Sequence, residues 1–63
     1  MTNEQKNKMI DDRIAQHEVK IFSIELDLVA LRLANDTEMV KQLEKSAEIL
    51  NKAIDELERM KVM

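Results

Sequence analysis

Apolar residues recur at two separate sets of positions in the first half of this 63-residue chain. In both sets the spacing alternates between three and four residues, which is the repeat of one face of an α-helix. The first set, here called the first stripe, comprises Ile10, Ile14, His17, Ile21, Ile24, Leu28 and Leu31. The second set, here called the second stripe, comprises Val19, Phe22, Leu26, Val29 and Leu33. Because a helix that is apolar on two faces needs two covering surfaces, we predict that another chain supplies one of them.

The only cluster of residues that disfavours a helix interior is Asn35-Asp36-Thr37. Before this cluster, Thr2 and Gln5 have the spacing of a capping box, which starts a helix. After it, an apolar heptad resumes, and Asn35 or Asp36 is placed to cap the helix that carries it. The heptad comprises Val40, Leu43, Ala47, Leu50, Ile54 and Leu57.

These signals predict an all-α fold with helices at about 3–34 and 37–61, in a single domain over residues 1–63. The chain contains neither glycine nor proline, the residues that tight β-turns generally require. Its abundant Glu, Lys, Leu, Ile and Met are compatible with long helices. We expect the terminal residues 61–63 to fray.

Two arrangements of the helices satisfy this pattern. In an antiparallel hairpin, residues equally distant from the Asn35–Asp36 junction face each other, and every facing pair along the first stripe is apolar except His17 with Ile54. In a single long helix, the second stripe continues through Asp36 into the second heptad, as in a parallel coiled-coil dimer. We favour the hairpin, because the long helix places the capping cluster at its centre and leaves the first stripe uncovered.

His17 is the one polar residue of the first stripe. It could make the helix–helix seam sensitive to pH, since a neutral imidazole tolerates burial better than a charged one. We favour a simpler interpretation, in which His17 fixes the register near the open end of the hairpin and meets Glu18 or solvent. A single histidine without cysteine predicts no metal site.

The charge pattern argues against several partner classes. The net charge is −3 and the basic residues form no block, so nothing favours binding to nucleic acid or to an anionic membrane surface. Lys20, Glu25, Asp27 and Arg32 interrupt the most apolar segment, which argues against a membrane span. We therefore expect a soluble, cytoplasmic protein without nucleic-acid, membrane or small-molecule partners.

We also expect no enzymatic activity, and no catalytic or cofactor-binding residue is predicted. The chain has thirteen Asp and Glu residues, but acid–base catalysis needs a cleft that perturbs the carboxyl pKa values, and two thin helices provide none. No nucleophile–base arrangement or glycine-rich phosphate loop is present.

Two functions fit these features. Cores this small rarely supply more than about 3–5 kcal/mol of stability without a disulfide, a metal or an oligomer. We therefore expect a protein–protein interaction module: a self-assembling structural or scaffold element, in which the second stripe is the partner-binding surface of a homo-oligomeric helical bundle or coiled coil. The alternative is a small adaptor, chaperone or inhibitor that docks this stripe onto a larger protein. Small phage-encoded viral proteins and secretion-system chaperones include helical hairpins of similar size.

Overall fold

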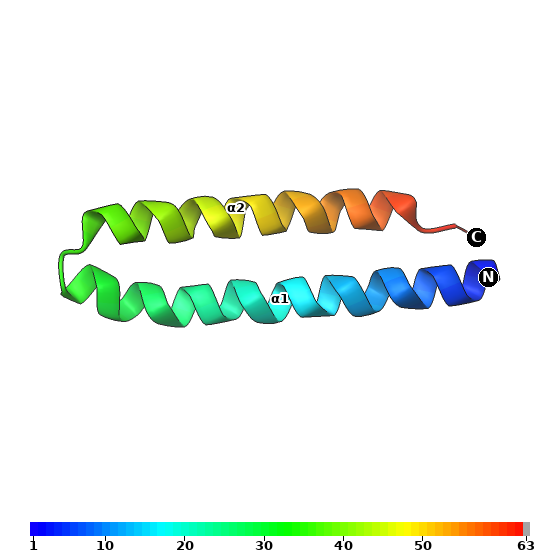
Figure 1. The fold of residues 1–63 in the computed structure, drawn as a ribbon, viewed down its shortest axis with the longest axis horizontal. Coiled ribbons are helices and arrows are strands. Elements are labelled where there is room, and N and C mark those ends of the chain that lie inside the picture. Colours follow the sequence, from blue (N-terminus) through cyan, green and yellow to red (C-terminus); the bar gives the residue numbers. More distant parts are fainter. Residues whose placement is uncertain (63) are drawn as a thin grey trace.

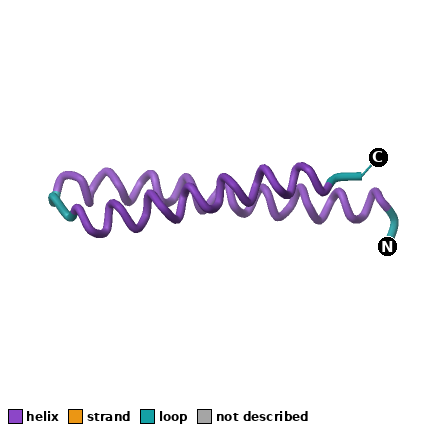
Figure 2. The backbone as a smooth tube through the Cα atoms, turned by 90° about the horizontal axis from the view of Figure 1, so that it is seen from above, coloured by secondary structure: helices purple, strands orange, loops and turns teal. Residues whose placement is uncertain are grey.

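The computed structural model describes residues 1–62, which form two helices, α1 (Asn3–Leu33) and α2 (Thr37–Met60). The helices lie side by side and antiparallel, with both chain ends at the same end of the molecule (Figure 1). Viewed from above, their axes cross instead of running strictly parallel (Figure 2). The molecule measures 49 × 15 × 13 Å. The predicted all-α hairpin is confirmed, and the single long helix is wrong.

Short-range hydrogen bonds fix the start of each helix. The Thr2 hydroxyl accepts a hydrogen bond from the Gln5 backbone N–H at 3.1 Å, and the Gln5 side chain accepts one from the Thr2 backbone N–H at 2.8 Å. The predicted capping box is therefore present. At α2, the Asp36 carboxylate accepts a hydrogen bond from the Met39 backbone N–H at 3.2 Å. Each helix also ends one residue earlier than predicted.

The turn between the helices depends on Asn35, whose φ of 57° lies in the left-handed region. The Asp36 N–H donates to the Leu31 carbonyl at 3.0 Å, and the Asn35 N–H donates to the Arg32 carbonyl at 3.1 Å. This pair of bonds is the Schellman motif, which usually places glycine at the left-handed position. The chain has no glycine, and asparagine is among the few other residues that tolerate this conformation. Asn35 thus stops α1 and reverses the chain direction.

The hydrophobic seam lies between the two helices and is thin. Every residue of the first stripe is buried or partly buried, and so is every residue of the α2 heptad. Among the described residues only Ile14 and Leu28 are fully inside, at 7% and 6% exposed. One helix packed on one helix can shield only a single face of each, so the seam leaves the rest of both surfaces open.

The open end of the hairpin is held by polar contacts that the sequence does not predict. The Val62 backbone N–H donates to the Asn7 side-chain oxygen at 2.8 Å, and the Lys61 ammonium group pairs with the Asp11 carboxylate. Residues 61 and 62 lie beyond the end of α2 but make these contacts with α1, and Met63 lies outside the described residues. Each contact joins residues at nearly equal distances from the turn, as the predicted register requires.

The charge of Lys61 is favoured by this environment. Its hydrogen bonds to Asp11, which has the larger effect, and to Glu58 raise the pKa of the ammonium group above its usual value. Because all three side chains are exposed to solvent, we assign the contacts a role in ordering the end of α2 and little role in overall stability.

His17 lies in the seam and is partly buried. Its Nδ1 atom is buried and has no hydrogen-bond partner within the described part of the chain. His17 is thus partly exposed, as expected, but its Nδ1 atom makes no hydrogen bond to Glu18 or to any other described residue. A buried polar atom without a partner costs about 1–3 kcal/mol, so an apolar side chain at this position should make the hairpin more stable.

Facing positions of the seam can be tested by crosslinking. Leu28 and Leu43 lie at equal distances from the turn, so Leu28→Cys together with Leu43→Cys should form a disulfide within one chain. The native chain has no cysteine to compete. The measurement is the mass of the oxidised product under denaturing conditions, which should equal that of a single chain. A control pair, Leu28→Cys with Lys45→Cys, should give no such product because Lys45 is exposed. An exclusively intermolecular product at positions 28 and 43 would contradict the hairpin.

Replacing His17 with leucine should raise the free energy of unfolding by about 1 kcal/mol or more, because the change removes an unpaired buried nitrogen and completes an apolar layer. Urea or thermal unfolding followed by circular dichroism measures the difference. The control variant His17→Asn keeps a polar group in the seam and should give no gain. A His17→Leu protein no more stable than the native one would show that the imidazole is adequately solvated.

Candidate protein-binding surface

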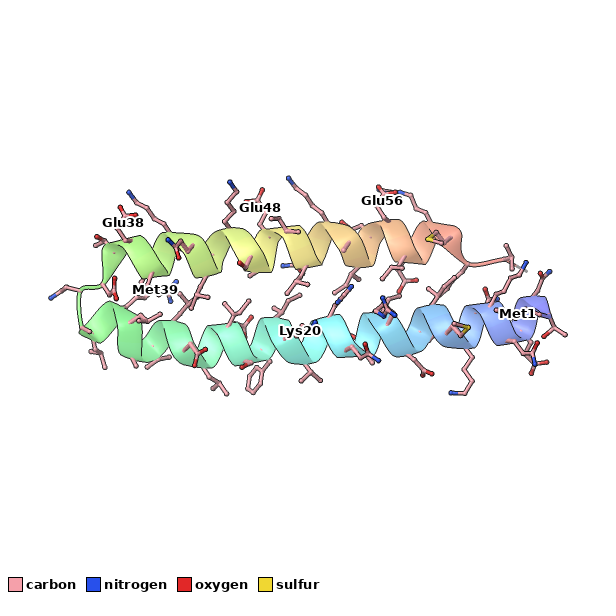
Figure 3. All side chains as sticks on the ribbon, viewed as in Figure 1. Met1, Lys20, Glu38, Met39, Glu48 and Glu56 are labelled. Carbon is pink, nitrogen blue, oxygen red and sulfur yellow. The ribbon has the colours of Figure 1, made fainter. Side chains whose placement is uncertain are left out.

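The second stripe forms an exposed apolar face on α1. Because 3.6 residues make one turn, its centre lies roughly 150° around the helix from the centre of the first stripe. The first stripe packs against α2, so the second stripe points away from α2. The five side chains are all exposed, by 58–82%: Val19, Phe22, Leu26, Val29 and Leu33. Figure 3 shows a row of side chains projecting from α1 on the side opposite α2. The structure thus brings all five predicted site residues onto one surface.

The outer face of α2 has a different character. Glu38, Glu48 and Glu56 project from α2 on the side away from α1 (Figure 3). Glu48 forms an exposed ion pair with Lys52 at 3.1 Å, one helical turn further on. Such pairs keep a helix face solvated. The comparison shows that α2 is amphipathic in the ordinary way, whereas α1 is apolar both toward α2 and away from it.

The two flanks of the second stripe differ in size and charge. One flank carries Glu18, Glu25 and Arg32, all exposed. Arg32 also reaches across the hairpin to Glu44 of α2, at 3.7 Å. In helices that pair through an apolar stripe, charged residues at flanking positions select the partner and its orientation. This flank is therefore suited to recognise a complementary charged edge.

The opposite flank carries Gln16, Ser23 and Ala30, which are also exposed. Ser23 and Ala30 are small and uncharged, so they allow a neighbouring backbone to approach closely. A shallow open hollow between the helices begins at this flank and is lined in part by Leu26, Ala30 and Met39. The second stripe is therefore bounded by a charged edge on one side and a low edge on the other.

Sequence reasoning missed part of the exposed apolar surface of α2. Ile49 is 57% exposed, although it directly precedes Leu50, which is part of the seam. Met39 and Met60 are exposed as well. Ile49 has helical spacing with Met39, Ala53 and Met60, which widen the apolar face of α2 beyond the heptad. This spacing is the signal that could have indicated an exposed apolar edge beside the seam.

Other kinds of site find no support in the described residues. Over residues 1–62 no group of three or more His, Cys, Asp or Glu side chains is placed to hold a metal ion. No helix in the described part of the chain is long and apolar enough to cross a membrane. The hollows that the structure shows along the hairpin are open to solvent.

The arrangement that remains is an apolar helical surface of about four turns with one charged edge. Its five large apolar side chains are exposed to solvent, so covering them would bury hydrophobic area. Comparison with protein families, with characterised proteins and with solved structures finds no match to this chain.

Proposed function

We propose that this protein is a non-enzymatic interaction module that self-assembles through the second stripe into a structural or scaffold element. The supporting observation is the exposure of five large apolar side chains along one face of α1. At roughly 100 Å² for each side chain, the stripe presents about 500 Å² of contiguous apolar surface. Patches of this size on a monomer commonly mark an interaction surface.

The thin seam of the hairpin points in the same direction. Only two side chains of the described residues are fully inside the fold, so hydrophobic burial within one hairpin is limited. Each further side chain taken out of water contributes about 1.5–3 kcal/mol. Covering the second stripe would therefore bury five more large side chains and would stabilise α1 on both of its apolar faces.

A second candidate function is an adaptor, chaperone or inhibitor that binds a larger protein of different sequence. Met39, Ile49 and Met60 favour it, because they are exposed on α2 and a contact confined to the second stripe leaves them uncovered. Methionine side chains adapt to varied partners. On this alternative the isolated protein has no discrete oligomer of its own.

The mass of the native protein and of one double variant tests the proposal. Light scattering at low micromolar concentration should give a discrete oligomer for the native chain. Phe22→Glu combined with Leu26→Glu should abolish this oligomer, because each buried unpaired charge costs several kcal/mol. Circular dichroism should show a loss of helicity as well, because the remaining two-helix unit is marginally stable.

The matched control places the same charges on the outer face of α2. Lys45→Glu with Lys52→Glu should leave the mass unchanged, because both positions are exposed and the Lys52–Glu48 pair contributes little. If the Phe22/Leu26 variant keeps the native mass, the second stripe is ordinary surface and the proposal is wrong. A native chain that is monomeric under these conditions supports the second candidate.

A further inference from the structure

The geometry points to one specific assembly: two copies pair through α1 in antiparallel orientation, with Phe22 of each copy against Leu26 of the other. This inference rests on the proposed function and specifies its partner, a second copy of the chain, and its register. Four features of α1 support it. They are the spacing of the apolar residues, the uncharged flank (Gln16, Ser23 and Ala30, here called the small flank), the charged flank (Glu18, Glu25 and Arg32), and the area available for burial.

The spacing of the second stripe is symmetric when Ala15, an exposed residue one turn before Val19, is included. The intervals are then four, three, four, three and four residues, the same in both directions. An antiparallel copy therefore places Ala15 opposite Leu33, Val19 opposite Val29 and Phe22 opposite Leu26. Each of these layers occurs twice and every one is apolar, as antiparallel helix pairing requires.

The small flank favours close approach at the centre of this pair. The two-fold axis passes near residue 24, so Ser23 lies next to Ser23 of the second copy, and Ala30 lies next to Gln16. None of these residues is charged or branched at the β-carbon. The helices can therefore approach without a steric or electrostatic obstacle on this side.

The charged flank supplies complementary contacts in the same register. Glu18 of each copy lies near Arg32 of the other, which gives two attractive pairs. The Arg32 side chain is 58% exposed beside Glu44, so it has room for a second carboxylate. Glu25 lies near its own copy at the axis, and this single like-charge contact is exposed to solvent and screened by salt.

Other arrangements of two α1 helices satisfy fewer of these features. A parallel pair also has apolar layers, but it places Glu18 near Ser23 and Glu25 near Ala30, so no flanking ion pair forms. An antiparallel pair shifted by one heptad places Val19 against Asp36 and loses the layers made by Ala15. The symmetric register keeps all six layers apolar.

The area and shape are consistent with a stable dimer. The five side chains on each of two copies would bury about 1,000 Å², the lower limit for a specific interface, and the flanks add to it. Because the two stripes lie nearly opposite each other on α1, the four helices form a row, with the two α1 helices in the middle. This arrangement differs from a square four-helix bundle.

Spin labels on single cysteines measure the orientation in the full-length protein. Met9 and Lys20 are exposed and lie outside both stripes and both flanks of the second stripe, so Met9→Cys and Lys20→Cys should leave the fold and dimer intact. With a rise of 1.5 Å per residue, labels at position 9 of two antiparallel copies should lie about 45 Å apart. Labels at position 20 should lie within about 30 Å of each other, because this position is only about four residues from the two-fold axis. Pulsed electron paramagnetic resonance reads both distances, and light scattering of the same samples gives the mass.

Each alternative gives a different result. Short distances at both positions would indicate a parallel pair and overturn the inference, while the proposed self-assembly would stand. A separation of about 55 Å at position 9 would indicate the register shifted by one heptad and would also overturn it. A monomeric mass with no measurable coupling between labels would overturn both the inference and the proposed function.

Discussion

The imbalance between the two helices dominates this structure: α1 has two apolar faces, and α2 can cover only one. The seam uses the first stripe and the heptad of α2. The outer face of α2 is charged and needs no cover (Figure 3). The five side chains of the second stripe are left in water, and the hydrophobic effect favours any arrangement that removes them from it. The proposed function and the proposed dimer both follow from this one imbalance.

The turn between the helices is what leaves the second stripe of α1 uncovered. Asn35 adopts a left-handed conformation, and Asp36 caps the next helix, so α1 stops and the chain reverses within a few residues. Had the helix continued, the second stripe and the α2 heptad would have formed a single apolar line. The reversal assigns the α2 heptad to the first stripe and leaves the second stripe without an intramolecular partner. A few capping hydrogen bonds therefore decide which apolar face is available to another protein.

The features predicted correctly from sequence are those that depend on neighbouring residues or on helical period. Capping by Thr2 and Asp36 is local, and the first stripe follows from spacing alone. The period also separated the second stripe from the seam, which is why all five of its residues were found on one exposed face. The choice between hairpin and long helix was harder, because the second stripe and the α2 heptad share one continuous register that only Asp36 interrupts.

The features that were missed depend on contacts between distant parts of the chain. The hydrogen bond between Val62 and Asn7 joins the two ends of the sequence, and no local pattern signals it. The isolation of His17 Nδ1 depends on how closely the second helix approaches that position. The exposure of Ile49 depends on the rotation of α2 against α1. The spacing of apolar residues defines only roughly how far α2 is rotated about its own axis against α1.

The dependence of thermal stability on protein concentration tests the central claim that α1 buries its second face against another copy. A dimer is stabilised by mass action, whereas an isolated hairpin is not. Each tenfold increase in concentration adds about 1.4 kcal/mol to the apparent stability of a dimer, which corresponds to several degrees in the unfolding midpoint for a chain of this size. We predict that the unfolding midpoint rises by several degrees for each tenfold increase in protein concentration across the micromolar range. A midpoint that stays constant over about a hundredfold change in concentration would contradict the account.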